Sequence, residues 1–93
     1  MAKDKRKTEI LLASCGTLAE VAANTSAEQE IAVSGVSVGD FVAVTKPTAQ
    51  AGIGIVGARV SATDVVSVTF MNTTAAGVTP TGSEVYVFFV AKQ

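Results

Sequence analysis

From Ser26 onward the sequence falls into short β-like runs separated by turn residues, and this rhythm restricts the chain to a small sandwich or barrel. The runs are rich in Val and Thr, they alternate apolar with polar residues, and they end at Gly, Asp or Pro. The expected strands lie within residues 28–35, 38–46, 53–60, 65–72 and 84–92. We therefore predict an all-β fold, a small antiparallel β-sandwich or barrel.

The last of these runs, EVYVFFVAK, is apolar on both of its faces. One face would carry Tyr86, Phe88 and Val90, and the other would carry Val85, Val87 and Phe89. A strand in an isolated sandwich needs only one face buried in the core. Either the N-terminal segment of the chain covers the second face or a neighbouring subunit does, and the two can combine if that segment is exchanged between subunits.

The N-terminal segment differs in charge from the rest of the chain. Its first seven residues contain four basic side chains and one acidic one, whereas the remaining residues contain three basic and seven acidic ones. We expect residues 1–23 to form an extended arm and residues 24–93 to form the β-sandwich body. Nucleic acid is not an expected partner, because no aromatic residues accompany the basic ones, and an acidic protein surface fits the arm at least as well.

Three glycines, Gly52, Gly54 and Gly57, have the G-x-G-x-x-G spacing of dinucleotide-binding folds. That motif requires a preceding strand, a following helix and a much longer chain. Here a loop with Pro47 precedes the glycines, and the β-branched run that follows them disfavours a helix. We interpret them as positions of a bulge, a bend or a close backbone approach in a strand, and we expect no cofactor.

The composition removes the commonest catalytic and metal-binding arrangements. With no His and one Cys, the chain has no Ser-His-Asp triad, no Cys-His pair and no ordinary zinc site. The carboxylates Asp40, Asp64 and Glu84 fall at expected strand ends or turns, where they commonly cap or solvate. We expect no enzyme activity, no catalytic residue and no metal. No apolar run reaches the length that spans a membrane.

Cys15 has no partner within the chain, so folding needs no oxidising compartment, and assembly in a cytoplasm fits. Arg59 is the one charge inside an apolar strand, and it is expected either to extend its charged end to solvent, to pair with an acidic neighbour, or to lie at a subunit interface.

The phrases GVSVGDFVAVTKP, AGIGIVGARVSATDVVSVTFMNTT and PTGSEVY resemble small virion proteins of tailed bacteriophages. The resemblance covers about residues 26–90, and it is to the β modules used as capsid decoration or cement proteins and as parts of head or tail fibres. It implies a virion structural protein, assembled in the bacterial host cytoplasm, that forms a homo-oligomer, often a trimer. Such a protein sits on the outer capsid surface and bridges neighbouring subunits of the major capsid protein. The resemblance supplies no catalytic motif.

Under this interpretation the N-terminal arm docks on the capsid. Its expected docking residues are basic or apolar: Lys3, Lys5, Arg6, Lys7, Ile10, Leu11 and Leu12. Its expected subunit interface contains Arg59, Tyr86, Phe88 and Val90. The alternative is a head or tail fibre, or a receptor- or glycan-binding module, whose ligand contacts would lie in the loops 47–52 and 73–83.

Overall fold

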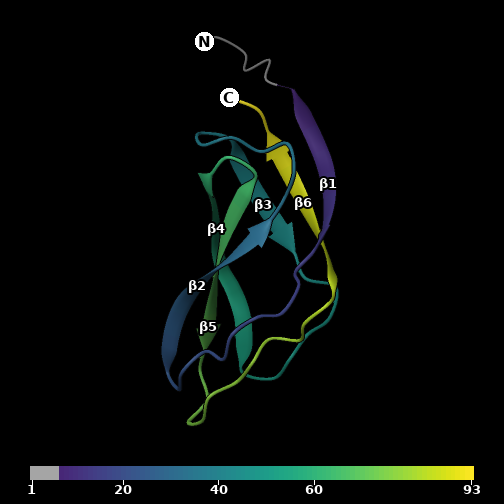
Figure 1. Ribbon diagram of the computed structural model, residues 1–93. Coiled ribbons are helices and arrows are strands. Elements are labelled where there is room, and N and C mark those ends of the chain that lie inside the picture. The colour runs from purple at the N-terminus through teal and green to yellow at the C-terminus, as the bar shows by residue number, and fades with distance from the viewer. Residues whose placement is uncertain (1–6) are drawn as a thin grey trace, which may run out of the picture.

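The computed structural model describes residues 7–93, which form two three-stranded antiparallel sheets (Figure 1). The strands are β1 (Thr8–Ser14), β2 (Thr25–Ala32), β3 (Phe41–Thr45), β4 (Ile53–Ala62), β5 (Val65–Asn72) and β6 (Val85–Ala91). One sheet, called the β6 sheet, has the order β1-β6-β3, and the other, called the β5 sheet, has the order β2-β5-β4. The predicted all-β fold is confirmed, and because both sheets are open it is a sandwich and not a closed barrel.

The core lies between the two sheets and is built from alternate residues of their strands. Its largest fully buried side chains are Tyr86 and Phe88 from β6 and Phe70 from β5. The remaining core residues from the strands are smaller: Ile31, Val42, Val60, Val66, Val68 and Val90. Each central strand therefore buries a full row of side chains, and this burial is the main stabilising contribution to a domain of this size.

We expected the chain to divide at residue 23 into an arm and a body, but the described residues show no such division. β1 pairs with β6 along its whole length, from Thr8 opposite Ala91 to Ser14 opposite Val85. The segment after β1 crosses the end of the sandwich and places Cys15, Leu18 and Val21 in the core. Within residues 7–23 the expected arm is thus part of the body, because it supplies an edge strand and buried side chains. Residues 1–6 lie outside the described part of the chain.

The glycine-rich stretch contains the predicted bulge, and β4, the strand that carries it, lies at the edge of its sheet. The pairing of β4 with β5 shifts register between Ile55 and Gly57. Gly52 precedes the strand with a φ of 78°, and a Cβ atom there would collide with the side chain of Thr74. Glycine is needed at this position for both reasons. Gly54 and Gly57 face open space.

Candidate functional site

The structure reverses the expected roles of the two faces of β6. Tyr86, Phe88 and Val90 were expected at a subunit interface, but they are completely buried in the core of the single chain. Val85, Val87 and Phe89 point outward instead and stay exposed. The interface assignment of the first three residues is therefore wrong, since side chains that already fill the core have no surface to offer a partner.

The outer face of the β6 sheet is a continuous apolar surface. Six large apolar residues make up this surface, and each is between 39% and 69% exposed: Ile10 and Leu12 from β1, Phe41 from β3, and Val85, Val87 and Phe89 from β6. An exposed apolar patch that spans a whole sheet is unusual in a monomeric protein. This outer face of the β6 sheet is the candidate functional site.

The strand register brings these side chains together. Phe89 lies opposite Ile10 of β1 on one side and opposite Ala43 of β3 on the other. Val87 lies in the same way between Leu12 and Thr45. Residues directly opposite in an antiparallel pair point to the same face of the sheet. The surface is therefore three strands wide, with its central row supplied by β6.

Charge is absent from this face over the three strands that the structure describes. Of the residues in β1, β3 and β6, only Glu9 is charged. Glu9 lies opposite the buried Val90, so its side chain belongs to the inner side of the sheet, and it forms an ion pair with Lys7 at 3.5 Å. The outer face thus presents only aliphatic, aromatic and small side chains.

The outer face of the β5 sheet is polar by contrast. Arg59 makes a two-pronged ion pair with Glu28, in which Nε donates to Oε2 at 2.7 Å and Nη2 donates to Oε1 at 3.0 Å. These bonds lower the pKa of Glu28. Ser61 and Ser67 share a hydrogen bond of 2.7 Å beside this pair. Arg59 therefore pairs with an acidic neighbour, and it lies on the opposite sheet from the three residues with which it was grouped.

The expected docking residues are divided by the same alternation. Ile10 and Leu12 are exposed on the candidate site, whereas Leu11 points inward and packs against the core. Leu11 is thus wrongly assigned as an anchor for a partner. Lys7 is exposed, and Lys3, Lys5 and Arg6 lie outside the described residues.

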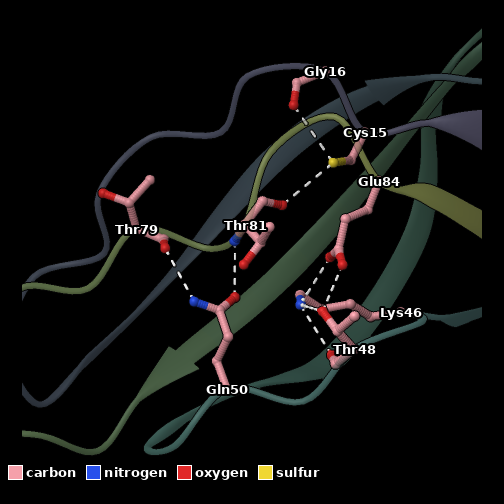
Figure 2. Close-up of polar contacts among 8 residues, drawn as sticks. All are labelled: Cys15, Gly16, Lys46, Thr48, Gln50, Thr79, Thr81 and Glu84. Carbon is pink, nitrogen blue, oxygen red and sulfur yellow. Dashed lines mark hydrogen bonds and ion pairs between the residues drawn. The ribbon is translucent and has the colours of Figure 1, made fainter.

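A polar cluster closes one end of the sandwich (Figure 2). Glu84 pairs with Lys46 at 3.0 Å and accepts a hydrogen bond from Thr48 Oγ1 at 2.5 Å. The hydrogen bond from Thr48, followed by that from Lys46, lowers the pKa of Glu84. Beside it, Gln50 donates to the carbonyl of Thr79 at 3.3 Å and accepts from the amide of Thr81 at 2.8 Å. These contacts fasten the loop after β3 to the loop before β6.

The other two carboxylates considered in the sequence, Asp40 and Asp64, also form ion pairs or hydrogen bonds within the chain. Asp40 pairs with Lys92 at 2.9 Å, and Asp64 accepts a hydrogen bond from the amide of Gly35 at 2.8 Å. Glu84 precedes β6 and Lys92 follows it, so the ion pairs of Glu84 and Asp40 lie at opposite ends of that strand. The three carboxylates are not brought together. Cys15 is free and buried, and its Sγ lies 3.6 Å from the carbonyl oxygen of Thr81.

Other kinds of site are not seen in the part of the chain that the structure describes. Residues 7–93 contain no cavity and no group of three or more Cys, Asp or Glu side chains placed to hold a metal ion. The same residues include no helix that is long and apolar enough to cross a bilayer.

The outward residues Phe41, Val85, Val87 and Phe89 were missed as site residues. No signal in the sequence separates the last three from Tyr86, Phe88 and Val90, because both sets are apolar and alternate along the same strand. Their grouping with Ile10, Leu12 and Phe41 depends on which strands are neighbours, and only the topology provides that.

Comparisons of this chain with protein-family models, with curated proteins and with solved structures gave no match. The assignment of a function therefore depends on the geometry of the surface and on the resemblance noted in the sequence.

Proposed function

We propose that this protein is a structural subunit of a larger particle and that its function is assembly. The observation that carries the proposal is the difference between the two outer faces. The outer face of the β5 sheet carries charged and hydrogen-bonding side chains, as a solvated face does, whereas the outer face of the β6 sheet is apolar and uncharged over its three strands. An uncharged apolar surface of this size is typical of a site where another molecule binds.

The resemblance to small virion proteins indicates which kind of particle to propose. We propose a capsid decoration or cement protein of a tailed bacteriophage, which binds the outer capsid surface and bridges neighbouring major capsid protein subunits. The basic residues Lys3, Lys5, Arg6 and Lys7 would then face acidic capsid surface. In a trimer, three weak contacts act together through effective concentration, so that the combined affinity exceeds a single contact by 100-fold or more.

The fibre or glycan-binding alternative has less support. It places ligand contacts in the loops 47–52 and 73–83. Side chains in these loops bond to one another or to the strands nearby, as Gln50 does with Thr79 and Thr81 and as Thr73 does with the carbonyl of Gly52. Polar groups engaged in this way are less free to bind a sugar.

The test is binding of the purified full-length protein to capsids of a phage that encodes it. We expect the protein to be present in many copies in purified particles, and to sediment again with particles from which it has been stripped. A variant with Lys3, Lys5 and Arg6 replaced by Glu should bind stripped capsids at least about 10-fold more weakly. Raised salt should also lower the affinity of the unmodified protein for capsids, because it screens the same charges. A matched variant with Lys3 and Lys5 replaced by Arg keeps the charge and should bind normally.

Two results would contradict the proposal. The first is absence of the protein from purified particles, and the second is a failure of the folded, full-length protein to bind stripped capsids. Normal binding by the Glu variant would contradict only the docking role of the basic residues.

A further inference from the structure

We propose that the outer face of the β6 sheet packs against the same face of other copies of this chain. The occupant of the apolar surface would then be the protein itself, in a closed symmetric oligomer with β6 nearest to the symmetry axis. This inference rests on the proposed function in one respect, because a permanent structural subunit is the kind of protein in which a permanent interface is expected.

The N-terminal residues that the structure describes, from Lys7 onward, do not cover this face. β1 lies beside β6 in the plane of the sheet and extends the face instead of covering it (Figure 1). The residues before Lys7 include Lys3, Asp4, Lys5 and Arg6. Their chemistry does not suit an apolar sheet, since burial of unpaired charge is costly. Residues 7–93 thus leave the face exposed, and this favours a cover that comes from another molecule.

The size of the face matches one side of a stable interface. Its six large apolar residues are between 39% and 69% exposed. With about 200 Å² for a fully exposed large apolar residue, these fractions amount to roughly 650 Å². A standard protein–protein interface buries about 800 Å² on each partner. The small residues between them, such as Thr8, Ala43 and Thr45, supply much of the remainder.

The chemistry of the face favours identical copies over a different protein. The core of a homo-oligomeric interface is more apolar than that of a transient one, and charged residues are depleted there. A face with no charge has no electrostatic means of selecting a different partner, whereas a second copy offers a face of the same apolar chemistry. β6 itself has the continuous apolar run of a strand that is buried on both sides.

The geometry identifies the residue closest to the axis. β6 is the central strand, and Val87 lies near its middle with Leu12 on one side and Thr45 on the other. In a closed ring of copies that meet at this face, the central strands approach one another most closely. Val87 of one copy should then lie near Val87 of the next.

The first test measures the mass of the full-length protein in solution. At micromolar concentration we expect an oligomer, and the trimer implied by the resemblance is the expected size. Phe89→Asp places a charge in the interface and should raise the dissociation constant for self-association by at least about 30-fold. Val56→Asp is the matched control: Val56 is 65% exposed on β4 of the other sheet. It should leave the oligomer unchanged, and circular dichroism should show that both variants keep the fold.

A second measurement keeps the inference testable if Phe89→Asp fails to fold. Val87→Cys retains a small apolar side chain, and mild oxidation should join copies of it by a disulfide across the axis. Val56→Cys, the control on the other sheet, should cross-link at least about 10-fold more slowly. Comparable rates in the two variants would overturn the inference.

The failure of this inference is distinguishable from failure of the proposed function. An intact chain that stays monomeric at micromolar concentration, yet binds capsids, would overturn self-packing and leave the structural role standing; the capsid would then cover the face. An oligomer that Val56→Asp disrupts and Phe89→Asp does not would place the interface on the β5 sheet and also overturn the inference. A stable oligomer that is absent from particles would overturn the proposed function alone.

Discussion

At the scale of single residues, Asp40 joins the turn before β3 to the end of the chain. Its Oδ2 accepts from Lys92 Nζ at 2.9 Å and from the amide of Ser37 at 3.0 Å, and its Oδ1 accepts from the amide of Gln93 at 2.9 Å. The Lys92 hydrogen bond, with the amide bonds from Gln93 and Ser37, lowers the pKa of Asp40 from 3.8 to about 2. The ionised carboxylate therefore stabilises the folded state.

This shift predicts how stability depends on acid. Because the pKa of Asp40 is lower in the folded protein than in the unfolded one, its contribution is complete above pH 3.8 and is lost as the pH falls toward about 2. Asp40→Asn should lower the free energy of unfolding at pH 7 and should flatten its decline between pH 4 and pH 2. Urea unfolding at several pH values measures both effects. Glu30→Gln, an exposed carboxylate on β2, is the control, and an equal flattening in that variant would contradict the assignment.

At the scale of elements, β1 determines how much of the N-terminus can be removed. β1 forms one edge of the β6 sheet, and the residues that follow it, Cys15 and Leu18, are buried. Removal of β1 would expose the edge of β6 and uncover the inner side of its sheet, and an uncovered apolar edge strand promotes aggregation.

Two truncations test this role of β1. Deletion of residues 2–6 should leave the thermal midpoint within a few degrees of the intact protein, because β1 and its pairing remain. Deletion of residues 2–14 should abolish the cooperative transition, and the chain should aggregate. Circular dichroism and light scattering on heating measure the two outcomes. A cooperative, soluble 2–14 deletion would show that β1 is dispensable for the fold.

The elements also show what the sequence could reveal and what it could not. The strands after residue 24 were predictable within a few residues, because alternation and turn residues mark them locally. The strand character of β1 was hidden by its charged neighbours, and its partner residues on β6 lie 71 to 83 positions later in the chain. The outward set on β6 was not predictable, because Tyr86, Phe88 and Val90 are about as apolar as Val85, Val87 and Phe89. Only packing against the second sheet distinguishes the two sets.

At the scale of the whole molecule, the two sheets differ in how far apart their strands lie in the chain. β4 and β5 are consecutive and are joined by the two-residue turn Thr63–Asp64. In the β6 sheet the first strand pairs with the last, and β3 also pairs only with β6. The β6 sheet therefore cannot form until the last strand is present, whereas the β4–β5 hairpin needs only local contacts.

This topology predicts an order of folding. The β4–β5 hairpin should form first, and the pairing of β1 and β3 with β6 should form last, because closing a long loop costs more entropy than closing a turn. The overall rate should be in the range of milliseconds to seconds that is typical of all-β domains. Refolding of the chain, with hydrogen exchange pulses analysed by mass spectrometry, should show protection of the amides in residues 53–72 before those in residues 85–91. Simultaneous protection of both regions, or earlier protection of β6, would contradict this order.

Association of the folded chains should add a separate kinetic phase. If the outer face of the β6 sheet is covered by other copies, a further slow phase should appear whose rate rises with protein concentration. Phe89→Asp should remove that phase without changing the earlier ones.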